Sequence, residues 1–225
     1  ISADTGTSDS DFETKTAAQT LTATLSAALA SDDILEVSVN AGSSWATATG
    51  DVTTTSLSTS ITLSGSSAIH IRITDDAGNV GTADTTSYVL DTTAPTISYS
   101  SVAISADTGT SSSDWETKTA AQTLTATLSA AMESDDVLEV SVNAGSSWSD
   151  KTSDVTTTSL STSITLTDDT TSAIHIRITD DAGNVGTATT QAYTHDDTAP
   201  TQSYSSVDIS ADTGTSDSDF ETKTA

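Results

Sequence analysis

The stretch AIHIRITDDAGNVG occupies residues 68–81 and recurs letter for letter at residues 173–186. In its first half, three isoleucines alternate with His70 and Arg72, which is the period of a β-strand with one buried face and one solvated face. In its second half, the run DDAGN consists of residue types that favour tight turns. The stretch therefore predicts a sheet strand that ends in an acidic turn.

Five further segments carry the same strand signals. They are rich in Thr and Val, they are separated by Gly and Asn, and none carries a helical period. They occupy residues 19–29, 34–40, 56–63, 82–91 and 96–105. Short strands with turn signals about every dozen residues are typical of an immunoglobulin-like Greek-key sandwich. We therefore predict an all-β chain.

The chain also repeats itself over a long period. Residues 1–63 align without a gap on residues 104–166, at an offset of 103 residues, and beyond the loop at residues 167–172 the offset is 105. Such a period is too long for a solenoid unit and suits a domain with its own core. We expect tandem Ig-like domains arranged end to end as a rod.

The domain boundaries follow from the two prolines, Pro95 and Pro200, which lie in the related segments DTTAPT and DDTAPT. Proline fixes its own backbone and favours an extended residue before it, as in a linker. The prediction is a first repeat without most of its opening strand, a complete second repeat, and the opening strand and loop of a third, at residues 1–94, 95–199 and 200–225.

This division puts the chain out of register with its folding unit. We expect it to be a piece of a longer tandem array. The strand near residues 204–209 would then have no sheet of its own, and we expect strand exchange between copies, in which it fills the vacant edge of another first repeat.

Charge restricts the classes of partner. The 225 residues carry 32 acidic and 6 basic side chains, a formal net charge of -26. Nucleic acid is not expected as a partner because phosphate binding needs clustered Lys and Arg. No membrane insertion is expected, since no run of eighteen apolar residues occurs. Disulfide staples are excluded because the chain has no cysteine. Cations are the natural partners.

Acidic segments are expected to meet where two repeats join. If the strands alternate in direction along the rod, the DTG loop (residues 4–11) and Asp91 face two loops of the second repeat, the ESDD loop (residues 133–136) and the DDAGN loop (residues 180–184). Clustered carboxylates repel unless a cation intervenes, and Ca2+ accepts six to eight oxygen ligands from irregular loops. Zn2+ is disfavoured without Cys or spaced His. The expected ligands are Asp4, Asp11, Asp91, Asp135, Asp136, Asp180 and Asp181.

Other interpretations stay open. The acidic loops could serve only to keep a repetitive protein soluble. Against this, the aspartates recur between the copies, including Asp32, Asp33, Asp75 and Asp76. Trp45 and Trp148 could grip a glycan or a surface, which would make the chain a ligand-binding adhesion module. No enzyme is expected, because no nucleophile has the turn context it needs.

The motifs SADTGTSxSD, SVNAGSSW and ITDDAGNVG occur in this order in both units, followed by DTTAPT in the first and DDTAPT in the second. Together they resemble the bacterial immunoglobulin-like repeats of giant secreted adhesins of the RTX and biofilm type, which are found in host-binding and ice-binding bacteria. The resemblance covers the whole chain. It implies an extracellular location at the bacterial cell surface and a role as extender domains that project a terminal adhesive module.

The resemblance also implies Ca2+ at the junctions between neighbouring repeats of the same chain. In this sequence the corresponding aspartates fall in the DTG loops, before the linkers and in the DDAGN loops: Asp4, Asp107, Asp212, Asp11, Asp114, Asp219, Asp91, Asp196, Asp75, Asp76, Asp180 and Asp181. The second copy departs from the first by carrying Asp197 where the first has Thr92. Its ligand set is therefore expected to differ.

Overall fold

The computed structural model describes the chain except for residues 168–169, 211, 214, 217–219 and 224–225. The described residues form strands, turns and two short 3-10 helices, η1 (Thr49–Asp51) and η2 (Thr152–Asp154). No helix in this part of the chain is long and apolar enough to cross a membrane. The structure confirms the predicted all-β class.

The first domain is a sandwich of two sheets. One sheet has the order β1-β8-β7-β3-β4 and the other the order β2-β6-β5. Neighbouring strands are antiparallel except for β1 and β8, which pair in parallel with Glu13 opposite Val89. The strands are β1 (Glu13–Thr14), β2 (Ala18–Thr24), β3 (Ile34–Ser38), β4 (Ala46–Thr47), β5 (Val52–Thr53), β6 (Ser56–Thr62), β7 (Ser67–Thr74) and β8 (Asp84–Leu90).

The second domain repeats this plan with one additional strand. Its sheets have the orders β10-β17-β16-β12-β13 and β14-β15-β11-β9, and β9 is the addition. The strands are β9 (Tyr99–Ile104), β10 (Glu116–Thr117), β11 (Ala121–Leu128), β12 (Val137–Ser141), β13 (Ser149–Asp150), β14 (Val155–Thr156), β15 (Ser159–Thr165), β16 (Thr170–Thr179) and β17 (Thr189–His195).

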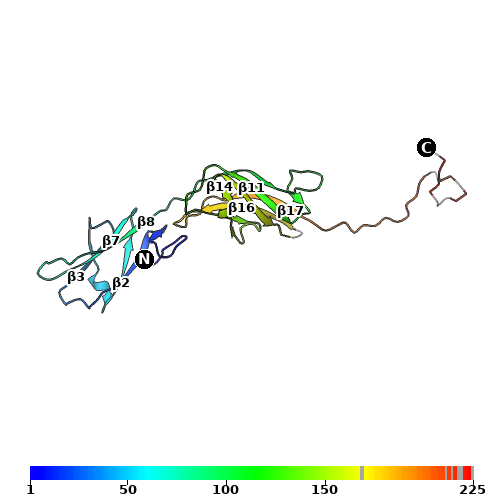
Figure 1. Ribbon diagram of the computed structural model, residues 1–225. Helices are drawn as coiled ribbons and strands as arrows, with labels where there is room; N and C mark the ends of the chain where they lie inside the picture. Colours follow the sequence, from blue (N-terminus) through cyan, green and yellow to red (C-terminus); the bar gives the residue numbers. More distant parts are fainter. Residues whose placement is uncertain (168–169, 211, 214, 217–219, 224–225) are drawn as a thin grey trace.

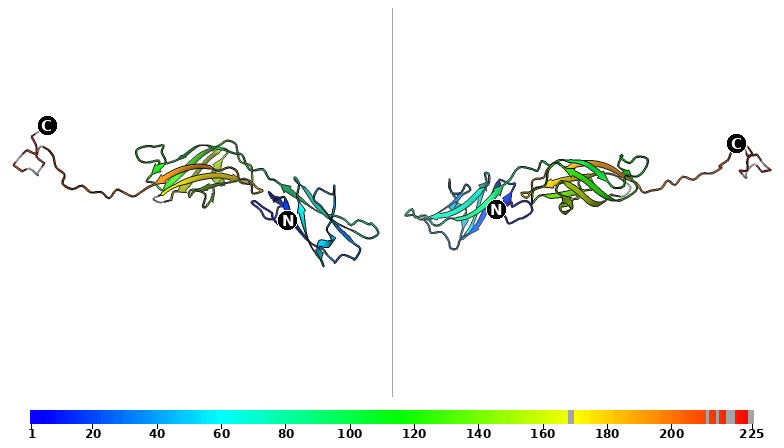
Figure 2. Two further views of the ribbon diagram at one scale, coloured as in Figure 1. Left: turned by 180° about the vertical axis from the view of Figure 1, so that it is seen from behind. Right: turned by 45° about the horizontal axis from the view of Figure 1, so that its top comes forward.

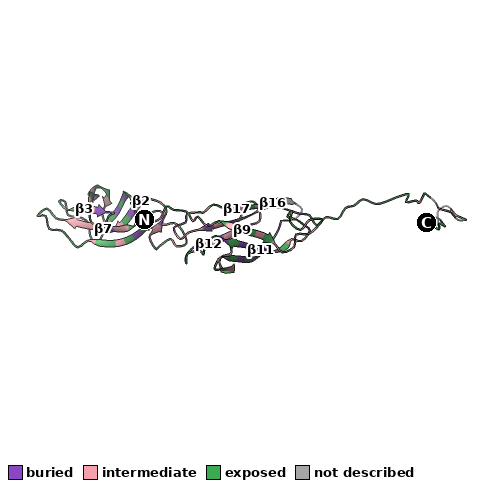
Figure 3. Cartoon of the chain, turned by 90° about the horizontal axis from the view of Figure 1, so that it is seen from above, coloured by how far each residue is buried: buried purple, intermediate pink, exposed green. Residues whose placement is uncertain are grey.

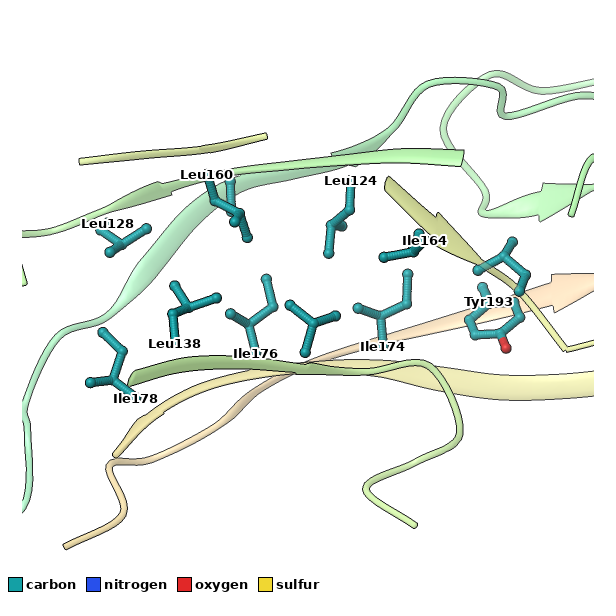
Figure 4. Packing of buried hydrophobic residues seen from close by; sticks show 12 residues of the cluster. Leu124, Leu128, Leu138, Leu160, Ile164, Ile174, Ile176, Ile178 and Tyr193 are labelled. Atoms are coloured by element: carbon teal, nitrogen blue, oxygen red, sulfur yellow. The ribbon is translucent and has the colours of Figure 1, made fainter. Parts of the chain in front are cut away.

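The chain crosses between the sheets in the order of a Greek key. Strand β11 lies in one sheet and β12 in the other, and the chain crosses again from β15 to β16. Side chains from the two sheets meet in the middle, where Leu124 and Leu160 face Ile174 and Ile176 (Figure 4). Alternate residues of β11 are buried and exposed, as the period of two predicts.

The two sandwiches follow one another along the molecule, and the C-terminal residues leave the second sandwich at the end away from the first (Figures 1 and 2). Residues 200–208 form no strand and are exposed, and they extend beyond the second domain (Figure 3). Tyr204 is 93% exposed. A strand needs a hydrogen-bonded partner, and this segment has none among the described residues.

Candidate functional site at the domain junction

The DTG loop is shaped by its own aspartates. The Asp4 carboxylate accepts a hydrogen bond from the Phe12 amide at 3.1 Å, and the Asp11 carboxylate accepts one from the Glu13 amide at 2.9 Å. Phe12 has a φ of 64°, an uncommon conformation that the loop must support. The equivalent bonds form in the second copy from Asp107 and Asp114. The loop conformation is therefore encoded locally.

The DDAGN loop is also closed by an aspartate. Both Asp180 oxygens accept hydrogen bonds from Asn184, at 2.7 Å from its amide and 3.0 Å from its side chain. Asp75 and Asn79 form the same pair in the first copy, and these bonds lower the pKa of Asp75. Asp180 therefore points into its own loop and leaves the backbone of the next three residues to face outward.

The two loops meet across the junction. Thr5 Oγ1 donates to the Ala182 carbonyl at 2.7 Å, and the Thr7 amide donates to the Asp181 carbonyl at 3.2 Å. The Thr7 hydroxyl also donates to the Asp181 carboxylate. Lys15 donates to the Gly183 carbonyl. The first domain thus binds mainly the backbone of the DDAGN loop.

The linker side adds a further contact. The Asn184 side chain donates to the Asp91 carbonyl at 2.9 Å, and the Asp91 carboxylate accepts from the Thr93 amide at 2.8 Å. Asn184 therefore connects the turn of the second domain to the end of β8 in the first.

Gly6 is the closest point of approach. A Cβ at this position would lie 1.6 Å from the Asp181 carbonyl oxygen, and its φ of +112° favours glycine. Docking also hides the DDAGN loop: Ala182 is 1% exposed and Gly183 is buried, whereas their counterparts Ala77 and Gly78 are exposed. The junction is therefore a close-packed backbone contact.

Four carboxylates gather around this contact. Partial burial raises the pKa of Glu13, and the negative charges of Asp181, Asp11 and Asp91 raise it further. A hydrogen bond between the Glu13 and Asp181 side chains acts in the same direction. The pKa of Glu13 is thus raised first by partial burial and then by the like charges that both domains bring near it.

Glu13 was not among the residues predicted from sequence. The available signal was its recurrence as Glu116 and Glu221 directly after each DTG loop. The short pairing of β1 with β8 places Glu13 beside Val89, close to the linker. That pairing has no sequence pattern of its own, since two residues are too few to show a period.

The ESDD loop makes its contacts within itself. Asp136 is 7% exposed and accepts from the Glu133 amide at 2.9 Å, while exposed Asp135 accepts from Ser134. Asp33 and Asp32 repeat these roles in the first domain. Across the described residues, no hydrogen bond connects these aspartates to the neighbouring domain. Their role as Ca2+ ligands stays a prediction.

The remaining predicted aspartates lie away from this junction. Asp76 is exposed on the DDAGN loop of the first domain. Asp107, Asp114 and Asp196 form the second copy of the DTG loop and linker region, where Asp196 accepts from the Thr198 amide at 2.9 Å. Asp212 accepts from the Phe220 amide at 3.1 Å in the third copy. Asp219 lies outside the described residues.

The donor set suits a hard cation such as Ca2+, which prefers carboxylate and carbonyl oxygens. One oxygen, Asp4 Oδ1, is buried and has no hydrogen-bond partner, and the same holds for Asp107 Oδ1 and Asp212 Oδ1. Within the part of the chain that the structure describes, no three acidic or histidine side chains already surround one point as metal ligands do. The residues therefore supply the chemistry of a Ca2+ site without a ready-made cage.

The tryptophans belong to a different cluster. The Arg72 guanidinium carbon lies 3.8 Å from the centroid of the Trp45 ring, and its Nε is 2.8 Å from Glu36. Arg177 covers Trp148 in the same way at 3.7 Å. Sugar stacking needs an open aromatic face, and here the guanidinium covers one face of each ring. The arrangement favours a structural role on the sheet surface.

Comparison with other proteins adds little to this geometry. No family model matches the chain, and no curated protein matches it. Among solved structures it is similar to the fibronectin(III)-like modules of Clostridium thermocellum CbhA, with 10% identity, coverage of 87% of this chain and 94% of the other, and a TM-score of 0.46. A likeness of that size carries no argument about this chain.

Proposed function

We propose that this chain is a stiff spacer, a tandem of extender domains that holds a terminal adhesive module away from a bacterial surface. The observation that carries the proposal is the junction, where Thr5, Thr7 and Lys15 of one domain bind the DDAGN backbone of the next. A spacer must resist bending at its linkers, and several hydrogen bonds across the linker between the first and second domains oppose bending there. The end-to-end order of the sandwiches supports the same role.

Calcium is the proposed stiffening agent. The ion would be held by the carboxylates of Glu13, Asp11, Asp91 and Asp181. Each carboxylate would then be attracted to the ion, and this attraction would outweigh the repulsion between the carboxylates. Lys15 already brings one positive charge to the junction through its bond to Gly183, and it is one of only 6 basic residues. A divalent cation would compensate the remaining charge. Extracellular Ca2+ is abundant enough for sites with a Kd of roughly 0.1–1 mM.

Small-angle X-ray scattering tests the proposal. The intact chain is measured in excess chelator, in about 10 mM CaCl2 and in about 10 mM MgCl2, since about 10 mM saturates a site of this class. We expect Ca2+ alone to lengthen and stiffen the molecule. Equal profiles in chelator and CaCl2, or an equal response to MgCl2, would contradict the calcium proposal.

Matched variants locate the effect. Glu13→Gln with Asp91→Asn removes two charges at the junction, while Glu116→Gln with Asp196→Asn removes the same two charges beyond the second domain. We expect the first pair to lose the Ca2+ response and the second pair to retain it. The opposite pattern would place the responsive site in the second DTG loop.

A further inference from the structure

Two buried polar residues, Thr14 of β1 and Gln19 of β2, lie at the base of the docked DTG loop and are 0% and 4% exposed. The Gln19 side-chain oxygen accepts a hydrogen bond from the Ala3 amide at 2.8 Å. The Gln19 side-chain nitrogen donates to the carbonyls of Ala3 at 2.9 Å and Thr16 at 2.7 Å. Ala3 precedes the loop and Thr16 follows it. One side chain therefore holds both ends of the loop that contacts the second domain.

The Thr14 hydroxyl has no hydrogen-bonding capacity to spare. It donates its proton to the Ala3 carbonyl at 2.7 Å. Its oxygen accepts from the Thr16 amide at 3.0 Å and from the Gln19 side-chain nitrogen at 3.4 Å. A hydroxyl offers one proton and two lone pairs. All three are therefore already in use inside the first domain.

Thr5 lies within the loop, and its hydroxyl reaches the second domain. Its oxygen accepts from the Lys15 amide at 3.0 Å and lies 3.3 Å from the Thr14 oxygen. Because Thr14 has no lone pair left to receive it, the Thr5 proton is directed to the Ala182 carbonyl of the second domain, 2.7 Å away. A carbonyl can only accept a hydrogen bond. The contact therefore depends on the direction of the Thr5 proton.

The second domain contains the same network. Gln122 and Thr117 are each 4% exposed, and the bonds of Gln122 to Ala106 and Thr119 measure 2.8, 2.9 and 2.7 Å, as they do around Gln19. Thr117 donates to the Ala106 carbonyl at 2.6 Å. Among the described residues, none of another domain accepts a hydrogen bond from its neighbour Thr108. The network therefore forms within a single domain and does not depend on docking.

We propose that Gln19 and Thr14 are positioning residues for the interdomain contact, which is the contact that carries the proposed function. They fix the two ends of the DTG loop and leave Thr5 with a proton that it can donate only outward. The loop then selects a hydrogen-bond acceptor, a backbone carbonyl that a tight turn such as DDAGN presents. A buried network with every member satisfied holds one conformation, because a rotation would leave a buried group without a partner.

Hydrogen–deuterium exchange of the intact chain, followed by NMR, measures the contact and the fold separately. The Thr7 amide donates to the Asp181 carbonyl across the junction, so its protection from exchange reports docking. The amides of β2 and β6, which pair with each other, report unfolding of the first domain. All samples contain chelator, so that Ca2+ plays no part in the result.

A conservative pair of variants tests Thr14. Thr14→Val removes the hydroxyl at nearly constant volume, whereas Thr14→Ser keeps it. We expect the Thr7 amide to be about fivefold less protected in Thr14→Val, as the loss of one hydrogen bond predicts, and close to native in Thr14→Ser. Thr117→Val makes the same change in the second domain and should leave the Thr7 amide unaffected. Equal protection in Thr14→Val and Thr14→Ser would overturn the positioning role.

A matched pair tests the amide, because Met has a length similar to Gln and cannot bond the loop ends. Gln19→Met and Gln122→Met should each lower the protection of the strands in their own domain. Only Gln19→Met should also lower the protection of the Thr7 amide, by at least as much as Thr14→Val does. If the Thr7 amide stays protected while β2 and β6 exchange faster, Gln19 supports the fold alone and the proposal is wrong.

Thr5→Val distinguishes loss of the contact from loss of its positioning. This variant removes the donor to Ala182 itself and should lower the protection of the Thr7 amide about fivefold. If Thr5→Val and Thr14→Val both leave that protection unchanged, the contact does not hold the domains together and the proposed function fails with it. If Thr5→Val alone lowers it, the contact stands and positioning by Thr14 and Gln19 is wrong.

Discussion

Leu128 in the second domain is 2% exposed, whereas Leu25 in the same position of the first domain is only partly buried. The two leucines share their neighbours in sequence, and the difference is the strand that covers them. Strand β9 lies over Leu128 and nothing described lies over Leu25. A single edge strand therefore decides whether one end of the core is closed.

The DDAGN loops show the same effect at the ends of the domains. Ala182 is 1% exposed because it is docked against Thr5, while Ala77 is exposed in an identical loop. Identical local structure thus acquires different burial from its surroundings. Each comparison can be tested by making the same substitution at equivalent positions of the two domains.

The largest effect is expected from core truncation. Leu128→Ala should cost about 2–5 kcal/mol of unfolding free energy in the second domain, because it leaves a cavity in a closed core. Leu25→Ala should cost less than half as much in the first domain, because the side chain is already partly in water. Denaturant unfolding followed by NMR signals of each domain measures both. Equal losses of unfolding free energy in the two variants would contradict the conclusion that Leu128 lies in a more closed core than Leu25.

The next largest effect is expected on the contact between the two domains. Gly6→Ala should disrupt the junction, because its Cβ would overlap the Asp181 carbonyl, while Gly109→Ala has nothing within 4 Å. Both glycines have φ near +115°, at +112° and +118°, so both variants carry similar backbone strain of roughly 1 kcal/mol or more. Scattering should show bending for Gly6→Ala alone. Equal flexibility would mean that loop strain, not interdomain contact, governs the shape.

On the sheet surface, equivalent substitutions should lower the stability of the two domains by a smaller and equal amount. Arg72→Ala and Arg177→Ala each remove an ion pair with Glu and a contact with Trp, at closely similar distances. These side chains are 24–25% exposed, so each loss should be about 1–2 kcal/mol. Thermal unfolding of each domain measures it. A clear difference between the two losses would show that β9, which covers β11 in the second domain, also affects the opposite sheet.

The smallest effect is expected from pH. The pKa of Glu13 is raised above its ordinary value of 4.5, so the docked junction gains stability when this carboxyl is protonated. That contribution is complete below about pH 4.5 and is lost as pH rises through the raised pKa. In metal-free buffer, lowering pH from 7 to about 4.5 should stiffen the molecule slightly, as measured by scattering. Glu13→Gln should remove this response and Glu116→Gln should retain it, and a response unchanged in Glu13→Gln would assign it to another group.

Much of the fold could be predicted from short patterns. The six strands expected at residues 19–29, 34–40, 56–63, 68–74, 82–91 and 96–105 contain all of β3, β6, β8 and β9 and all but the first residue of β2 and of β7. The alternation of apolar and polar residues identifies them, because a strand half-buried in a sandwich has a period of two. The two-residue strands β1, β4 and β5 were missed because they are too short to show that period.

Less of the candidate site could be predicted from the sequence. Asp91 and Asp181 were expected at the junction by counting strand directions, and both lie there. Glu13, the Thr hydroxyls and the approach of Gly6 were not expected, because backbone contacts between loops have no residue signature. The expected contribution of Asp135 and Asp136 depended on the same counting, which places loops at an end of a domain without saying which of them dock.

The sequence by itself determined the strands, the repeat and the conformation of the DTG loop, which Asp212 and Phe220 still close in the third copy without a sandwich behind it. These features depend on interactions between residues close in the chain, or on an alternation that any single strand displays. Only the tertiary structure decided which of the two identical DDAGN loops is buried and which carboxylates lie close enough to repel one another. Those outcomes depend on contacts between segments far apart in sequence, and the same residues meet different neighbours in each copy.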